Sequence, residues 1–270
     1  MNLISRIRLA LLAIFVVITA SGTVEVQMNR ADRVWIPEGT FHSIFPETEG
    51  EPVPVDSFMM DRFPVTNEQY RMFLEDHPKW KKSQIPAVFA GSDYLKHWES
   101  DLEPGSEIAS GTDRPVTRIS WFASNAYCKA QGGRLPTLAE WEYAAMALNL
   151  ESEQEWREMG SRLIGWYSAV NASLPEPVGS TGIINRYGVE DMHGLILEWV
   201  EDFKPPVADA LSFDCGTAGR LQGDGTLYNY ARVIRTLTRM SFKPQTVTSM
   251  IGFRCAYDST ENSELSEVQR

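Results

Sequence analysis

Two short motifs determine where helices begin in the first half of this chain. Each has a threonine followed three residues later by a glutamine or a glutamate: Thr66-Asn67-Glu68-Gln69 and Thr137-Leu138-Ala139-Glu140. This is the pattern of a capping box, in which the threonine hydroxyl accepts from an early backbone N–H and the later side chain reaches back. Apolar residues then recur at helical spacing, at Tyr70, Phe73 and Leu74 and at Trp141, Ala144 and Ala145. A helix is therefore expected after each motif.

A third helix is predicted to begin at Ser120 and to stop at Gly132-Gly133, because serine caps helix starts and glycine ends helices. Strand-like runs are short. The candidates are Val34–Ile36, Val53–Met59, Thr117–Ile119, Glu198–Val200 and Gly252–Ala256. The remaining residues are rich in Gly and Pro and are expected to form long ordered loops. Helices in the first half and short strands in a loop-rich second half indicate an α+β fold.

The first 22 residues read as a targeting segment. Arg6 and Arg8 precede an apolar run of twelve residues, Leu9–Ala20, and the small residues Ala20 and Gly22 fit a cleavage site. A membrane span needs about 20 apolar residues, so residues 1–22 are predicted to be a signal peptide. An uncleaved N-terminal anchor is the alternative, and it would be the chain's only membrane contact. Either way the protein is expected to be exported to a periplasmic or other extracytoplasmic compartment, where disulfides persist.

The net negative charge of the chain argues against nucleic-acid partners. The chain has 25 basic and 36 acidic side chains, a formal net charge of −11. Nucleic-acid binding needs a basic surface, so direct binding of DNA or RNA is disfavoured. The domain is expected to span residues 23–258. Residues 259–270 are polar and are expected to form a disordered tail.

Five segments together resemble the formylglycine-generating enzyme (sulfatase-modifying factor) family. They are FPVTNEQY at 63–70, PVTRISW at 115–121 with AYC at 126–128, GRLPTLAEWEY at 133–143, YGVEDMHG at 187–194 followed by Glu198-Trp199, and GFRC at 252–255. They stand in the family's order and cover roughly Val34 to Tyr257. The resemblance implies a single domain of C-type-lectin-like fold, loop-rich with short strands and few helices. The family includes several chemistries, so the fold does not settle the function.

The resemblance also assigns the cysteines. It implies a disulfide between Cys128 and Cys255. Formylglycine generators carry two further cysteines that bind Cu(I), a soft ion suited to thiolates. This pair would fall at Thr226 and Ala231, and neither is a thiol. A copper site is therefore not expected.

Cys215 is the one cysteine without an assigned partner, and it is the candidate catalytic residue. It stands in the small, Gly-rich run Asp-Cys-Gly-Thr-Ala-Gly. It can be a redox thiol, a single metal ligand or the point of an intermolecular disulfide. The alternative is a buried small apolar residue without chemistry.

A calcium site is implied by the stretch from Asp191 to Glu198. Carried over residue by residue, the ligands are the side chains of Asp191 and Glu198 and the carbonyls of Gly194 and Ile196. Calcium favours such a mixture of carboxylate and carbonyl oxygens. The sequence departs from the family at Gly194-Leu-Ile-Leu, and the alternative is two solvated carboxylates on a turn.

Several residues receive weaker assignments. The four histidines, His42, His77, His97 and His193, are dispersed, so a catalytic iron site is not expected. The resemblance places Arg239 and Ser241 at a substrate groove and Arg254 in a buried ion pair. Arg134 and Glu140 are expected to be structural.

Two functions from different classes remain open. The first is an exported maturation factor that oxidises an unidentified protein or small-molecule client without the usual copper pair. The second is a non-catalytic, calcium-stabilised binding or accessory module.

Overall fold

The computed structural model describes residues 32–42, 52–106, 113–169, 174–202 and 226–259. Three predicted features lie outside the described residues: the signal peptide expected at residues 1–22, Cys215 and nearly all of the expected tail. The described residues fall within one unit, Asp32–Arg270. Among them, no helix combines the length and the apolarity needed to cross a membrane.

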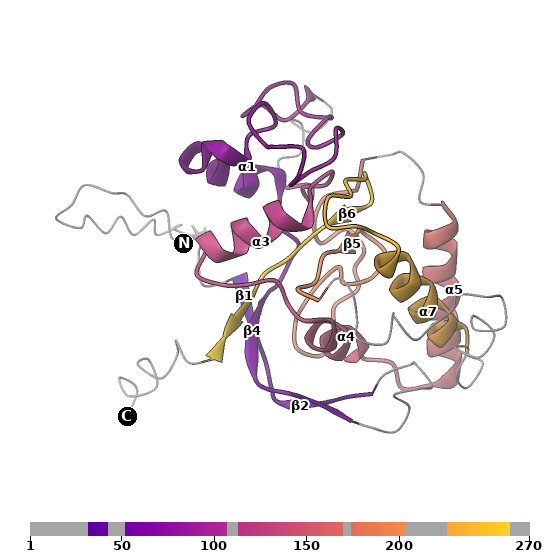
Figure 1. The fold of residues 1–270 in the computed structure, drawn as a ribbon. Helices are drawn as coiled ribbons and strands as arrows, with labels where there is room; N and C mark the ends of the chain where they lie inside the picture. The colour runs from indigo at the N-terminus through magenta and orange to yellow at the C-terminus, as the bar shows by residue number, and fades with distance from the viewer. Residues whose placement is uncertain (1–31, 43–51, 107–112, 170–173, 203–225, 260–270) are drawn as a thin grey trace, which may run out of the picture. The chain divides into compact units, whose positions relative to one another are not determined.

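A three-stranded antiparallel sheet forms the first part of the core. Its order is β1 (Arg33–Ile36), β4 (Phe58–Asp61) and β7 (Ala256–Asp258), so the last described strand pairs with one from the beginning of the chain (Figure 1). Met60 faces Val34 on one side and Ala256 on the other. The sheet packs on helix α4 through buried apolar side chains that include Ile36, Phe58, Leu138 and Trp141.

The other strands form two small pairs. β2 (Gly39–Phe41) and β3 (Val53–Val55) are antiparallel, and β5 (Leu197–Glu198) and β6 (Ile251–Gly252) are parallel. The expected strand at 53–59 is thus two strands, β3 and β4. The expected strand at 117–119 is absent because Arg118 has a φ of 54°, which is left-handed and incompatible with an extended strand.

The three predicted helices are confirmed. α1 (Asn67–Asp76) and α4 (Leu138–Met146) begin with complete capping boxes at Thr66 and Thr137, and α3 (Trp121–Ala130) begins at the Ser120 cap. A short 3-10 helix, η3 (Pro78–Trp80), follows α1. These starts were predictable because a cap is a contact between residues three apart in the sequence.

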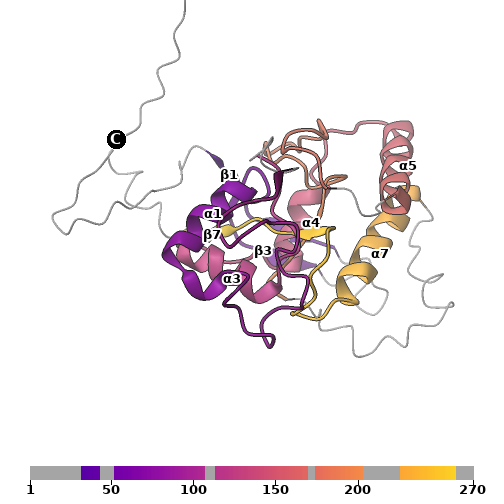
Figure 2. The same cartoon turned by 90° about the horizontal axis from the view of Figure 1, so that it is seen from above.

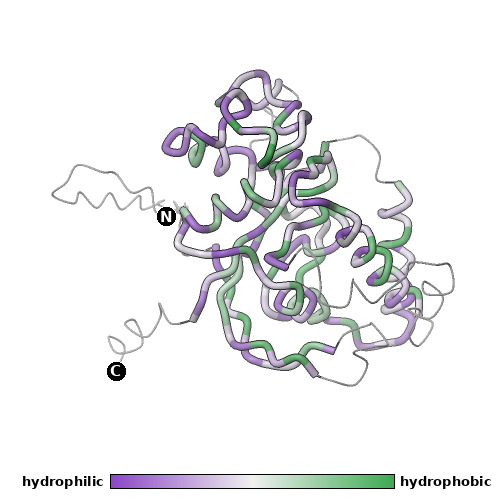
Figure 3. Tube along the Cα trace, in the orientation of Figure 1, coloured by the Kyte–Doolittle hydropathy of each residue, from purple (hydrophilic) through white to green (hydrophobic). Residues whose placement is uncertain are grey.

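Two longer helices contradict the expectation of a second half made of loops and short strands. α5 (Glu153–Ala169) and α7 (Leu227–Met240) lie side by side in both views of the ribbon (Figures 1 and 2). Their contact is close at Gly160, where an added Cβ would lie 2.4 Å from the backbone nitrogen of Tyr228. Figure 3 shows hydrophilic and hydrophobic residues intermixed along α7.

The disulfide between Cys128 and Cys255 is present. It joins α3 to the segment just before β7, with an S–S distance of 2.05 Å and 127 residues between the two cysteines. Both cysteines are fully buried. The bond therefore ties the first half of the domain to its C-terminal strand.

Candidate functional site

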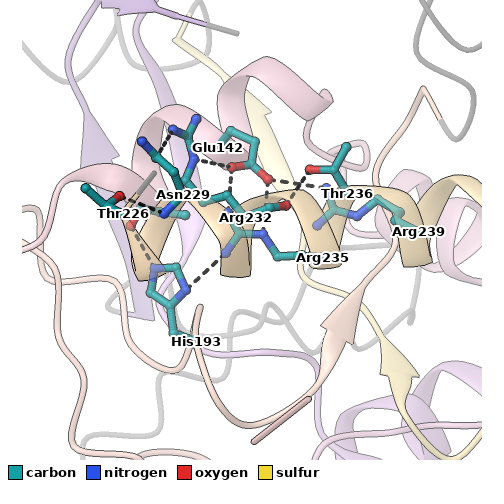
Figure 4. Close-up of polar contacts among 9 residues, drawn as sticks. Glu142, His193, Thr226, Asn229, Arg232, Arg235, Thr236 and Arg239 are labelled. Carbon is teal, nitrogen blue, oxygen red and sulfur yellow. Dashed lines mark hydrogen bonds and ion pairs between the residues drawn. The ribbon is translucent and has the colours of Figure 1, made fainter. Parts of the chain in front are cut away.

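The main concentration of buried charge lies between α7 and α4. Arg232, Arg235 and Arg239 follow one another at spacings of three and four residues, which places them on one face of α7. Figure 4 shows this face directed at Glu142 of α4. All three arginines are at most 4 % exposed, and Glu142 is 3 % exposed. Arginine and glutamate are almost never buried this completely without a partner.

Glu142 is bound chiefly by Arg235. Arg235 Nη2 donates to Glu142 Oε2 at 2.6 Å, and Arg235 Nε donates to Oε1 at 3.1 Å. Arg232 and Arg239 each lie 3.8 Å from a Glu142 oxygen. Burial on its own raises the pKa of Glu142, but the guanidinium groups of Arg235, Arg232 and Arg239 together hold this pKa below its usual range. Glu142 is therefore an ionised counter-charge and is unsuited to act as a general acid.

Arg239 lacks the hydrogen bonds that Arg235 makes. Both guanidinium groups lie over the ring of Trp141, with the carbon of Arg235 4.7 Å and that of Arg239 4.8 Å from the ring centroid. Within the described part of the chain, the Nε, Nη1 and Nη2 atoms of Arg239 are buried and have no hydrogen-bond partner. Burial lowers the pKa of Arg239, and the charge of Glu142 opposes this effect. Arg239, which the resemblance places at a substrate groove, is 2 % exposed in this structure, and its place in a groove stays a prediction.

His193 is fixed as a neutral imidazole beneath the arginines. Its Nε2 lies 2.8 Å from the Ala145 carbonyl oxygen, which can only accept, so Nε2 is the atom that bears the hydrogen. Nδ1 then accepts from Arg235 Nη1 at 3.2 Å. Burial first, and the charge of Arg235 second, lower the pKa of His193 to about 3. Both ring nitrogens are used, so His193 is a structural residue.

A second buried charge pair, Glu198 with Arg254, confirms the predicted role of Arg254. Arg254 Nε and Nη2 donate to the two carboxylate oxygens of Glu198, each at 2.8 Å, and Trp141 Nε1 donates to Glu198 Oε2 at 2.7 Å. Both charged side chains have no exposed surface. Arg254 also donates to the backbone carbonyls of Asp61, Arg62 and Glu190, and so ties the end of β4 and the segment at Glu190 to the C-terminal part of the domain.

The two side chains among the predicted calcium ligands, Asp191 and Glu198, accept from protein donors. Glu198 is bound by Arg254, as described above. Asp191 accepts from the Gly179 backbone N–H and from Thr181 Oγ1, the latter at 2.6 Å. A calcium ion with Asp191, Gly194, Ile196 and Glu198 as ligands would have to displace Arg254 from Glu198. The residues therefore fit a buried ion pair better than a cation, and the calcium site stays a prediction.

The copper positions and the groove residue Ser241 have local structural roles. Thr226 caps α7 by accepting from the Asn229 backbone N–H, and Ala231 is fully buried. Ser241 follows the last residue of α7, is exposed, and donates to the Thr238 carbonyl oxygen at 2.6 Å. In the described residues, no group of three or more His, Cys, Asp or Glu side chains is placed to hold a metal. Arg134 is structural as expected, because it binds Glu140 at 2.7 Å.

Two features were missed by sequence reasoning. The arginine face of α7 was detectable, because Arg232, Arg235 and Arg239 recur at helical spacing within ARVIRTLTR. A cavity of about 200 Å³ was not detectable, because it is lined by residues from three separate segments, among them His42, Tyr143 and Arg186. The Tyr143 and Tyr187 hydroxyls lie 3.2 Å apart at this cavity.

Comparison with known proteins gives one family. Residues 19–259 match the model of the family described as "Sulfatase-modifying factor enzyme 1-like domain". The chain is 29 % identical over 245 residues to the "Inactive C-alpha-formylglycine-generating enzyme 2" of Mus musculus, covering 76 % of each chain. It is 26 % identical over 284 residues to the "Formylglycine-generating enzyme" of Thermomonospora curvata, covering 83 % of this chain and 93 % of that protein. It is 30 % identical over 183 residues to the "Hercynine oxygenase" of Mycolicibacterium smegmatis, covering 58 % of this chain and 40 % of that protein.

Proposed function

This chain belongs to the family of sulfatase-modifying factor enzyme 1-like domains, and we propose that it serves there as an exported, non-catalytic binding or accessory module. In this proposal it recognises a client and does not perform copper-dependent oxidation with a pair of thiolates. The family resemblance covers the whole described domain, so the difference lies in the site and not in the fold.

The cysteine count carries the proposal. The whole chain has three cysteines, and Cys128 and Cys255 are joined to each other. At most one thiol, Cys215, is therefore available for metal binding in the oxidised protein. A two-thiolate Cu(I) site needs two thiols, and one chain with this disulfide cannot supply them.

Two further observations support the proposal. The positions to which the resemblance assigns the copper pair are a helix cap, Thr226, and a fully buried alanine, Ala231. One similar protein, from Mus musculus, is itself named as inactive. The extracytoplasmic location rests on the N-terminal apolar run and agrees with a disulfide, which persists in oxidising compartments.

Oxidation of a client through Cys215 is the second candidate. Its support is the unassigned thiol together with the similarity to a hercynine oxygenase. Cys215 lies outside the described residues, so its surroundings lend this candidate no weight. Alkylation of the native protein followed by mass spectrometry tests it, because an unreactive thiol would rule out chemistry at Cys215.

A side-by-side assay tests the main proposal. The Thermomonospora curvata enzyme and this protein are each incubated in air with Cu(I) and a cysteine peptide that the former converts. Oxygen uptake and peptide mass are then followed. We expect the reference enzyme to consume oxygen and convert the peptide, and this protein to do neither. Copper-dependent conversion by this protein would contradict the proposal.

The proposed function does not depend on calcium. The predicted calcium site is tested separately, by measuring the melting temperature of the chelated protein before and after calcium is added. A saturable rise that is lost in Asp191→Asn would show that the cation can replace the contacts described for Asp191 and Glu198.

A further inference from the structure

We propose that the C-terminal turn of α7 binds a small oxyanion, a carboxylate, sulfate or phosphate group, through the guanidinium of Arg239. The inference is independent of the proposed function, because it rests on the charge balance and the contacts of one buried cluster.

Among the described residues, Arg239 competes with Arg235 for the carboxylate of Glu142 and carries the positive charge in excess. The guanidinium of Arg235 lies 2.6 Å from this carboxylate, and that of Arg239 lies 3.8 Å from it. Both oxygens of that carboxylate already accept from Arg235. Arginine stays protonated in proteins, so the excess charge cannot be removed by loss of a proton. Buried charge without a counter-charge is strongly unfavourable.

The neighbouring carboxylates do not hydrogen-bond to Arg239. Glu198 is bound on both oxygens by Arg254. Asp202 is influenced by the charge of Arg239, but its Oδ1 accepts from the Leu138 backbone N–H at 2.6 Å. Among the described residues, Arg239 forms no ion pair other than the 3.8 Å approach to Glu142. An anion from outside this cluster would supply the hydrogen-bond acceptor that Arg239 lacks among the described residues.

Weaker interactions do not replace an anion. Arg239 lies in the last turn of α7, where the helix dipole contributes about half a negative charge. Trp141 attracts the guanidinium through its ring face. Neither interaction gives the three guanidinium nitrogens an acceptor, and all three are buried without one.

The geometry selects the chemical class. The ring of Trp141 lies against the guanidinium of Arg239, whose planar fork of N–H donors has no acceptor among the described residues. Such a planar fork matches the two oxygens of a carboxylate, sulfate or phosphate group. The 2 % exposure of Arg239 favours a single small group over a polyanion. Ser241, two residues farther along the chain, is exposed.

Calorimetric titration of the full chain tests the site. The probes are sodium sulfate, inorganic phosphate and sodium acetate, each in a chloride buffer of constant ionic strength. The variants are Arg239→Gln and, as a matched control, Arg157→Gln, because Arg157 is an exposed arginine on α5. We expect saturable one-to-one binding of at least one probe, at least tenfold weaker in Arg239→Gln and unchanged in Arg157→Gln. The probe that binds most tightly identifies the oxyanion class.

A stability comparison guards against a merely unfolded variant. In chloride buffer alone, Arg239→Gln is expected to melt at or above the wild-type temperature, because it removes a buried charge without a hydrogen-bonded partner. Arg235→Gln is expected to melt several degrees lower, because it breaks the bonds to Glu142. Absence of saturable binding to the wild type, equal binding by Arg239→Gln, or equal destabilisation by the two variants would each overturn the proposal. The last result would mean that the chain itself already neutralises Arg239.

Discussion

Glu142 and Glu198 are both buried beside arginine, but their surroundings differ. Glu198 and Arg254 form a matched pair in which each carboxylate oxygen has a donor. Glu142 satisfies Arg235 and leaves Arg239 in excess. A matched buried pair contributes little net stability but is costly to break, since removal of one partner leaves a buried charge. The Glu198–Arg254 pair is therefore structural, whereas the Glu142 cluster contains one guanidinium, that of Arg239, without a hydrogen-bonded acceptor.

Glu198→Gln is expected to lower the free energy of unfolding by about 3–5 kcal/mol, because Arg254 would remain buried without its counter-charge. Urea unfolding at pH 7 measures the loss. Glu153→Gln is the matched control, since Glu153 pairs with Arg157 on the surface of α5 and a surface pair contributes at most about 1 kcal/mol. A loss at Glu198 no larger than that at Glu153 would show that the pair is not essential.

His193 makes stability depend on pH in a defined direction. Its pKa is lowered from 6.5 to about 3 by burial and by Arg235. Between these values the unfolded chain binds a proton that the folded chain cannot bind, so stability decreases as pH falls through this range. His97, with a pKa lowered to about 4, acts in the same direction. Asp61, with a pKa raised to about 6, acts in the opposite direction.

His193→Gln isolates the contribution of His193, because His97 and Asp61 remain in both proteins. The slope of unfolding free energy against pH, measured by urea unfolding from pH 4 to pH 6, is expected to decrease by up to about 1.4 kcal/mol per pH unit in the variant. Identical slopes in the two proteins would show that His193 is protonated in the folded state.

At the scale of the elements, the sequence was informative where structure is local. Thr66, Ser120 and Thr137 cap the helices that were expected, because each cap bonds within one turn. α7 was missed because its buried face carries arginines, and such a face resembles a solvated one until Glu142 is placed against it. The fold, unlike the sequence pattern, brings this distant carboxylate to the helix.

The contact between α5 and α7 gives a prediction at this scale. Gly160→Ala would place a Cβ 2.4 Å from the Tyr228 backbone nitrogen, so the helices must separate, at an expected cost of about 1–3 kcal/mol. Gly165→Ala on the same helix meets no atom within 4 Å and is expected to stabilise α5 by up to about 1 kcal/mol. Thermal unfolding of both variants checks the pair. Equal effects of the two substitutions would contradict this packing.

At the scale of the whole molecule, the disulfide and the β1–β4–β7 sheet join the two ends of the domain. Cys128 and Cys255 lie 127 residues apart, and β7 pairs with β4 at the other end of the described chain. The disulfide persists in the unfolded chain and restricts it by closing a long loop. It also removes two of the three cysteines from redox or metal chemistry.

Loss of the disulfide is expected to lower the free energy of unfolding by about 4–5 kcal/mol, the value that the chain-entropy model gives for a loop of this length. The measurement is urea unfolding of the double variant Cys128→Ser/Cys255→Ser, and added reductant should leave this variant unchanged. Thiol titration of the denatured, unreduced wild type should find one thiol per chain. Three thiols would remove both this prediction and the count on which the proposed function rests.

The sequence by itself determined the α+β class, the family, three helix starts and the roles of Cys128, Cys255 and Arg254. These follow from contacts within one turn or from motifs that stand in a recognisable order. Only the tertiary structure decided that Arg239 is buried without a hydrogen-bonded partner and that Glu198 is already bound by Arg254. The physical reason is that the cost of a buried charge depends on which distant groups the fold brings to it, and a linear sequence does not contain those distances.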